Sequence, residues 1–474
     1  MQFTILSHAG LLVEHNGTRI VSDPWLRGSC YWRSWWNYPE PPAELVDNLR
    51  TDYIYLTHLH WDHFHGPSLR RLLEHNPKVR VLVPKVPTRR MLEDLEYLGF
   101  RDVLEIPHGS SLKLGEDLWL HSFQFGTAVD SAMVLTGGGY TLFNANDCKH
   151  FGLPLRQITN RFPRIDFVFR SHSSASPVPY CVDGYTEAFP NLRSPRDYIE
   201  EFTRFALHVR ARHAVPFASN HCFLHRDTYA FNATAVSPED VRAVYTQMAR
   251  DSGQQSECVV MAPGSRWSDA RGFEVQPFDY SQRGAHIAAL RDKHAGTLAA
   301  HYDLEAIAQV DAGSADSYLQ AFMRALPILR PRWLLTFRVT DSAGVHCWVL
   351  DFARRRVRRA PSPDPGGPVI DVPVAVFNDC VRIRMFSAWT ASKRLRIHLR
   401  NAQQLGVING VFSLLDFHEL DMLPLRRNFA PRALGVRLRR WRDVVEVVGL
   451  LIRHRILRQP FDIAALYPAT DRGG

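Results

Sequence analysis

The chain has 474 residues, which is long enough for two or three domains that each bury a core. Its hydrophobic content of 45% and charged content of 22% are those of an ordinary globular protein and exclude extended disorder. The net charge of +9 comes mainly from arginine and suits an acidic ligand, although scattered surface charge would give the same value.

The seven cysteines form no C-x-x-C pair, which argues against a disulfide framework or a zinc ribbon and favours a reducing compartment. The first residues lack the basic flank and apolar core of a signal peptide, and no apolar run reaches the length of a membrane span. We therefore expect a cytoplasmic protein, and we expect no nucleic-acid partner.

Residues 1–284 alternate short strands and helices, which predicts a layered α/β domain. Period-two apolar patterns and turn residues set the expected strands, and an apolar stripe sets one helix. Strands are predicted at 3–6, 11–14, 19–22, 53–56, 79–83, 118–124, 132–135, 140–144 and 166–170, and the helix at 67–75.

The later part of the chain has a different pattern. Within residues 285–425 we expect a helix at 317–326, a hairpin of strands 333–340 and 345–352, and a proline-rich linker at 360–368, which together predict a smaller α+β domain. Residues 426–474 are predicted to be a basic amphipathic helical tail, with one helix across 436–457. Such a helix either packs on its own protein with its arginines outward or lies on a membrane.

The stretch Thr57–His63 carries the chemistry, because it places three histidines and a carboxylate directly after the strand at 53–56. Alternate side chains of an extended segment point the same way, so His58 and His60 can bind one metal ion. The turn that follows brings Asp62 and His63 to a second ion. This H-x-H-x-D-H pattern resembles the metallo-β-lactamase superfamily, which implies a four-layer αββα sandwich with the metals at one edge.

A binuclear site needs further ligands. Asp147 follows the strand at 140–144, where the superfamily keeps a bridging aspartate, and one carboxylate can bind two metals. His172, His221 and His225 also follow strand-like segments. We favour His221 and His225 jointly over His172 as the late metal ligand, although each can instead be a hydrogen-bonded core histidine. Asp62 and His225 are the candidate catalytic residues.

The sequence departs from the superfamily pattern at one position. Most members have another histidine about twenty residues before the bridging aspartate, whereas this chain has none near residue 126. Asp130 can supply an oxygen ligand in its place. Oxygen-rich ligation favours iron or manganese over zinc.

Within the superfamily, the chain resembles the CMP-N-acetylneuraminate hydroxylase family. The resemblance rests on residues 7–10, 21–28, 35–36, 58–69, 143–148 and 216–218, in the same order and with similar spacing. It implies that His8 and Asp23 support the metal ligands, and that the smaller domain is similar to the family's C-terminal domain and sterol-carrier-like. The similar part begins after the Rieske iron–sulfur domain of that family, so we expect electrons from a ferredoxin or Rieske-type partner.

Three functions remain open. The first is a binuclear oxygenase, with iron preferred, that hydroxylates or N-oxygenates a polar, anionic small molecule such as a nucleotide sugar or an amino-acid derivative. The second is a zinc- or manganese-dependent hydrolase of a phosphodiester or lactone, with the same ligands and Asp62 orienting a water molecule. The third is a membrane-surface or lipid-binding module built on the C-terminal domain and the tail.

Overall fold

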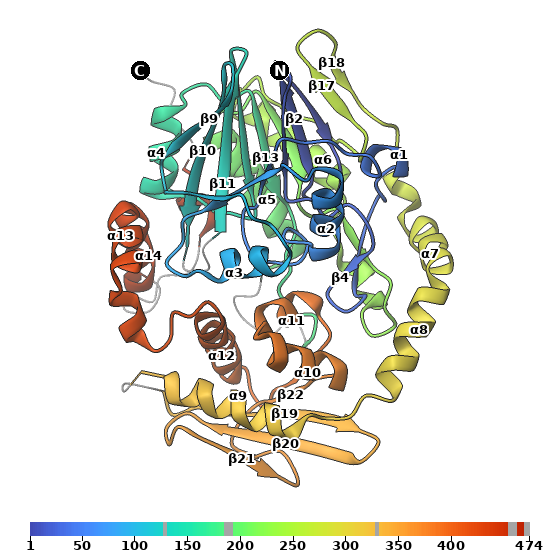
Figure 1. Cartoon of the computed structure of the whole chain (residues 1–474), viewed down its shortest axis with the longest axis vertical. Coiled ribbons are helices and arrows are strands. Elements are labelled where there is room, and N and C mark those ends of the chain that lie inside the picture. The colour runs from blue at the N-terminus through green and yellow to red at the C-terminus, as the bar shows by residue number, and fades with distance from the viewer. Residues whose placement is uncertain (127–129, 184–192, 328–330, 454–461, 469–474) are drawn as a thin grey trace.

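The computed structural model describes residues 1–126, 130–183, 193–327, 331–453 and 462–468, and Figure 1 shows the whole chain. Its N-terminal part contains two large β-sheets. The strands of the first sheet are, in spatial order, β18 (Gly272–Glu274), β17 (Arg266–Ser268), β1 (Gln2–Ile5), β2 (Leu11–His15), β3 (Thr18–Ser22), β6 (Tyr53–Tyr55), β7 (Arg80–Pro84) and β8 (Val103–Ile106). Those of the second are β16 (Glu257–Cys258), β14 (His213–Phe217), β13 (Phe167–Ser171), β12 (Tyr140–Asn146), β11 (Asp130–Gly137), β10 (Leu118–Phe125) and β9 (Ser111–Gly115).

Helices cover the outer face of each sheet. The helices α1 (Ala43–Val46), α2 (Gly66–His75) and α3 (Arg90–Tyr97) share a hydrophobic core with the first sheet. The helices α4 (Gly152–Arg161), α5 (Pro195–His208) and α6 (Pro238–Asp251) share another with the second sheet. A third core fills the space between the sheets. The expected four-layer αββα sandwich of the metallo-β-lactamase fold is therefore confirmed.

Alternation along the strands explains these layers. In β1, Phe3 and Ile5 point into the core between the sheets, and in β6 Ile54 points into the core beneath α2 while Tyr55 points between the sheets. Helix α2 buries Leu69 and Leu72 one turn apart on one face. The predicted strands and the helix at 67–75 are thus present with small shifts of their ends.

The parallel strands of both sheets bring the chemistry to one edge of the sandwich. β3, β6 and β7 are parallel in the first sheet, and β12, β13 and β14 are parallel in the second. The segments that leave the carboxyl ends of these strands carry Asp23, His58, Asp147 and His172. Side chains distant in sequence therefore meet at this edge.

A small third sheet lies at the same edge. Its strands are β15 (His221–Phe223), β5 (Trp35–Asn37) and β4 (Ser29–Cys30). The aromatic residues of this region are buried, and several of them join the hydrophobic core of the C-terminal domain. The members of that shared core from this region are Trp25, Tyr31, Trp32 and Trp35.

Two connecting helices run down one side of the molecule to the C-terminal domain (Figure 1). These helices are α7 (Arg283–Lys293) and α8 (Ala295–Ala306). Two short 3-10 helices, η1 (Tyr229–Thr234) and η2 (Tyr280–Gln282), come before them in the chain. The domain comprises α9 (Ala312–Ala325), α10 (Val374–Ile383), α11 (Phe386–Ser392), α12 (Gln404–Glu419) and the strands, in spatial order, β21 (Arg356–Ala360), β20 (Gly344–Asp351), β19 (Leu334–Asp341), β22 (Val369–Asp371) and β23 (Arg396–His398). β19 and β20 form the predicted hairpin.

The last segment returns to the N-terminal sandwich. It contains η3 (Leu425–Phe429), α13 (Pro431–Arg439), α14 (Trp441–Leu451) and α15 (Ile463–Leu466), and α14 contacts α4. The expected single helix at 436–457 is broken at Arg440, whose guanidinium donates to the Gly126 carbonyl oxygen (2.5 Å) and pairs with Asp443. Residues 454–457 of that prediction lie outside the described residues. No helix in the described part of the chain is long and apolar enough to cross a membrane.

A buried charge cluster ties the parts together. Glu305 of α8 pairs with Arg394 of the C-terminal domain, and its carboxylate also lies 3.3 Å from His225 Nε2 and 3.0 Å from His301 Nε2. Arg394 also pairs with Asp227 (2.9 Å). Because Arg394 is only 1% exposed, its charge depends on these carboxylates.

We therefore expect Glu305→Gln to lower the free energy of unfolding by about 3 kcal/mol, because it leaves a buried guanidinium short of one counter-charge. Glu200→Gln is the matched control, since Glu200 pairs with Arg204 on the solvent side of α5 and that pair is worth less than about 1 kcal/mol. Urea unfolding followed by tryptophan fluorescence measures both. Equal midpoints for the two variants would contradict this role of Glu305.

Candidate metal centre

The loop that follows β6 gathers three histidines at the sandwich edge. His58 Nε2 lies 2.8 Å from His60 Nδ1, and the ring centroids of His58 and His63 are 4.2 Å apart. His58 and His63 are buried, whereas His60 is half-buried. The structure thus brings the three predicted histidines together, with His60 nearest to solvent.

Carboxylates complete this cluster. His63 Nε2 lies 3.3 Å from Asp147 Oδ2 and 3.4 Å from Asp62 Oδ2. Metal–ligand bonds of about 2.1 Å place the ligands of a tetrahedral ion about 3.4 Å apart, so these separations match neighbouring ligands of one ion. The ligand atoms of His58, His63 and Asp147 all lie within 4.8 Å of one another.

Asp23 supports the ligand loop from beneath. Its carboxylate accepts hydrogen bonds from the Thr57 backbone N–H (2.8 Å) and the Thr57 hydroxyl (2.7 Å), and lies 3.0 Å from His63 Nδ1. A contact between the far nitrogen and a carboxylate fixes the orientation of a ligating imidazole and directs its Nε2 outward. Asp23 therefore occupies the supporting position that the sequence resemblance implied.

His8 lies among the possible metal ligands themselves rather than behind them. Its Nε2 lies 3.1 Å from Asp62 Oδ2, and the Tyr31 hydroxyl donates to Asp62 Oδ1 (2.5 Å). His8, Asp62 and His63 form a second group whose ligand atoms lie within 4.8 Å of one another. Sequence reasoning missed this role, for which the only signal was a histidine in a short S-H-A-G turn after the first strand.

The three late histidines, His172, His221 and His225, lie in two different places. His221 stacks on Trp35 with ring centroids 3.6 Å apart, and its ring centroid lies 5.5 Å from that of His8. His172 is also buried, and the neighbouring His8, together with burial, lowers its pKa to about 3. His225 instead joins His301 and Glu305. The structure therefore brings His221 and His172 to the metal edge, and it places His225 at the joint with α8.

Asp130 begins β11 and faces the same cluster. Burial raises the pKa of its carboxyl to about 6, and the groups that act on it electrostatically include His60 and Asp147. Its Oδ1 is buried. Asp130 therefore stays a candidate oxygen ligand in place of the superfamily's additional histidine, which the sequence lacks.

Ionisation of the cluster suits metal binding. Burial opposes a charge on Asp62 and Asp147, yet His63 holds the pKa of both carboxyls below their ordinary value. Burial lowers the pKa of His58 to about 4, so its ring is neutral near pH 7. Ionised carboxylates and neutral imidazoles are the forms that ligate metals. Burial opposes a charge on His63, yet the surrounding carboxylates raise its pKa, so a metal ion bound there would displace its proton.

The buried polar atoms of the cluster also fit metal binding. Within the described part of the chain, Asp130 Oδ1 is buried without a hydrogen-bond partner, and the buried His8 Nε2 and His63 Nε2 meet only the carboxylate oxygens named above, at 3.1 to 3.4 Å. Such atoms are costly unless something else satisfies them. All three belong to this cluster, so the donor set fits divalent metal ions.

The sequence also contains two strings, at 148–150 and 222–225, that formally match a Rieske site. Among the described residues, no group of three ligating side chains includes a cysteine. Cys148 and Cys222 are buried as free thiols. These strings therefore belong to the packing around the metal edge.

Comparisons with known proteins identify similar chains. No family model matches. A protein of Mycobacterium tuberculosis described as a Rieske 2Fe-2S iron–sulfur protein is 28% identical over 400 residues, which cover 77% of this chain and 74% of that protein. The cytidine monophosphate-N-acetylneuraminic acid hydroxylase of Xenopus laevis is 30% identical over 153 residues, which cover 31% of this chain and 26% of the hydroxylase.

Two solved structures match part of this chain with low overall similarity. The CmlA beta-hydroxylase has a TM-score of 0.40 and 19% identity, covering 56% of this chain and 52% of that chain. The isothiocyanate hydrolase from Delia radicum gut bacteria has a TM-score of 0.40 and 17% identity, covering 56% of this chain and 99% of that chain. The chain is a metallo-β-lactamase-fold protein similar to the hydroxylase family, and the donor set supports a metal-dependent enzyme.

The two late histidines provide a direct test of the site. His221→Ala should lower the bound metal from two ions toward one per chain, because the ring beside His8 is lost. His225→Ala should leave metal content unchanged and lower thermal stability, because it removes a contact with Glu305. Elemental analysis of metal-loaded, folded protein distinguishes the two. Metal loss in His225→Ala alone would reverse the assignment.

Proposed function

We propose that this protein is a binuclear oxygenase, with iron as its preferred metal, that hydroxylates or N-oxygenates a polar, anionic small molecule. The observation that carries the proposal is the donor set, in which Asp62 and Asp147 lie among the histidines of an edge cluster and Asp130 is near enough to interact electrostatically with His60 and Asp147. Carboxylate-rich ligation suits iron or manganese better than zinc.

In this proposal each metal has its own ligands. His58, His60, Asp130 and Asp147 would hold one ion, and Asp62, His63, Asp147 and His8 or His221 would hold the other. When bound, a reduced pair of iron ions supplies the electrons that activate dioxygen. Asp147 has a side chain that is 30% exposed, so the cluster is open to solvent on that side.

The chain's own residues would control protons at the site. Asp62 accepts the Tyr31 hydrogen bond through Oδ1, which leaves Oδ2 for the metal side. His8 Nε2 lies beside that Oδ2, where the ring either ligates a metal ion or donates a hydrogen bond to Asp62. Asp62 is therefore our candidate catalytic residue on this side of the cluster, as in the sequence-based prediction.

The reaction requires a second protein. Hydroxylation consumes the substrate, dioxygen, two electrons and two protons, and it yields the hydroxylated product and water. The two electrons must come from outside the chain, and a ferredoxin or Rieske-type donor fits. Support for that class of donor comes from the M. tuberculosis relative, which is described as a Rieske iron–sulfur protein.

Oxygen uptake tests this proposal against a zinc or manganese hydrolase. Protein loaded anaerobically with ferrous iron, then exposed to air-saturated buffer, should consume dioxygen and change its optical spectrum. Zinc-loaded protein should not hydrolyse bis-nitrophenyl phosphate or simple lactones. Iron-loaded protein that is inert to dioxygen, beside zinc-loaded protein that hydrolyses those esters, would establish the hydrolase instead.

Two variants serve as controls for the experiment. His60→Ala should lose metal and oxygen uptake, because the remaining ligands cannot close the coordination shell. His75→Ala, in the last turn of α2 and outside the cluster, should behave as the unaltered protein. Oxygen uptake that persists in His60→Ala would indicate that it reflects adventitious iron rather than iron in the cluster.

A further inference from the structure

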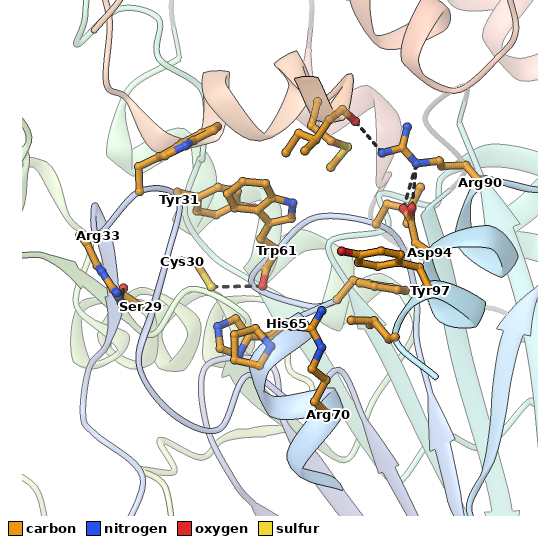
Figure 2. A pocket seen from close by; sticks show the side chains of 18 residues that line it. Ser29, Cys30, Tyr31, Arg33, Trp61, His65, Arg70, Arg90, Asp94 and Tyr97 are labelled. Atoms are coloured by element: carbon orange, nitrogen blue, oxygen red, sulfur yellow. Dashed lines mark hydrogen bonds and ion pairs between the residues drawn. The ribbon is translucent and has the colours of Figure 1, made fainter. Parts of the chain in front are cut away.

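The metal-ligand loop has a second face that the proposed reaction does not use. Leu59 and Trp61 of this loop belong to that face, whereas His58, His60 and Asp62 do not. Leu59 and Trp61 line a cavity of about 420 Å³, which is within the usual range of small-molecule sites. Figure 2 shows this cavity, with Trp61 and Tyr31 on one side.

The cavity walls are largely apolar. Tyr31 stacks on Trp61 with ring centroids 5.8 Å apart, and the ring centroids of Trp32 and Trp61 are 4.8 Å apart. Leu98 and Met385 also line the cavity, and Tyr97, which is 83% exposed, stands at its rim. Flat aromatic surfaces of this kind accept an aromatic or otherwise apolar body.

The charges at the cavity are not balanced. Arg90 pairs with Asp94 (2.9 Å) and is therefore neutralised. Arg33 donates to the Ser29 hydroxyl (3.0 Å), and Arg70 is exposed on α2. Among the described residues, neither Arg33 nor Arg70 has a carboxylate within ion-pair distance. Two guanidinium groups thus flank an apolar cavity, and guanidinium binds carboxylate, sulfonate or phosphate.

We propose that this cavity, lined by Arg33, Arg70, Tyr31 and Trp61, binds an organic anion with an aromatic or apolar body. The acid group pairs with one of these two guanidinium groups, the other adds positive potential at the cavity, and the body lies against Trp61. A bound molecule contacts the reverse side of the loop that carries the metal ligands and the Tyr31 ring whose hydroxyl holds Asp62. The site is separate from the metal cluster, so it does not depend on which reaction the metals perform.

Fluorescence titration with anilinonaphthalene sulfonate tests the site on the whole chain, with and without metal. Arg33→Gln and Arg70→Gln should each weaken binding by about threefold to fivefold, the usual range for a partly exposed ion pair. Arg71→Gln is the matched control, because Arg71 lies on the same helix and pairs with Asp47 outside the cavity. The uncharged phenylnaphthylamine should bind equally to all four proteins.

A blocking variant separates this cavity from other apolar surfaces that bind the same dye. A Cβ at Gly66 would meet only Leu98, at 3.7 Å, so Gly66→Leu enters the cavity without backbone strain. It should remove the saturable binding. Unchanged binding in Gly66→Leu, or equal affinities in Arg71→Gln and the two other arginine variants, would overturn the proposal.

A different surface carries a second inference. The helices α13 and α14 lie at the edge of the molecule in Figure 1, and together with η3 they carry exposed apolar side chains, here called the apolar stripe. Its members are Leu425, Phe429, Leu434, Leu438, Trp441, Val444, Val445, Val448 and Ile452, which are between 43% and 74% exposed. Contiguous apolar surface of this extent marks an interaction site.

The charge around the stripe is strongly positive. Residues 425–453 contain eight arginines and only two acidic residues. Both acids are engaged inward, since Asp443 pairs with Arg440 and Glu446 accepts from the Leu153 backbone N–H (2.8 Å). Arg426, Arg439 and Arg453 are exposed. Apolar side chains flanked by arginine are typical of helices that lie on anionic lipid.

From this pattern we infer that the stripe docks on an anionic membrane surface. Co-sedimentation with vesicles containing phosphatidylglycerol should retain the protein, whereas pure phosphatidylcholine should not, and salt should weaken retention. Leu438→Glu should lower partitioning about tenfold or more, because a leucine that inserts into the lipid is replaced by a charge. Leu304→Glu, on α8 and 66% exposed, is the matched control.

Two results would overturn this inference. One is equal retention of Leu438→Glu and the unaltered protein on anionic vesicles. The other is a dimer in sedimentation velocity that Leu438→Glu dissociates, without vesicle binding by either protein, which would make the stripe a contact between two copies of the chain.

Discussion

The metal edge depends on one buried carboxylate, that of Asp23. It lies at the end of β3, is fully buried, and is contacted by Thr57, His63 and Asn146. Thr57 and His63 follow the neighbouring strand of the same sheet, whereas Asn146 ends β12 in the opposite sheet. A buried carboxylate without such donors would be very costly. The hydrogen bonds that satisfy Asp23 therefore also hold the two sheets and the ligand loop in register at the site.

Local patterns were sufficient to predict much of this site. The spacing of His58, His60, Asp62 and His63 after a strand indicates shared ligation, because alternation is a property of the segment itself. Asp147 follows a strand in the same manner. The sandwich was predicted from the order of strands and helices together with the resemblance, and the structure confirms it.

Contacts between distant segments were not predictable in this way. His8 reaches Asp62 because β1, β2, β3 and β6 are neighbours in that order, which no local pattern specifies. His221 and His225 are four residues apart, yet β15 pairs with β5 and keeps His221 on Trp35, while the turn after Phe223 carries His225 to α8. The break at Arg440 likewise comes from a contact with Gly126, over three hundred residues away.

The smaller domain is part of how the metal edge is built. Trp32 Nε1 donates to Asp379 (2.9 Å), and the Ser34 hydroxyl donates to the Ser392 carbonyl oxygen (2.7 Å). Tyr31 and Trp35 share one hydrophobic core with that domain, and they contact Asp62 and His221 respectively. Without the domain these aromatic rings would face water and lose the packing that fixes their positions. The geometry on the Asp62 side of the cluster therefore depends on residues far along the chain from the motif that identifies it.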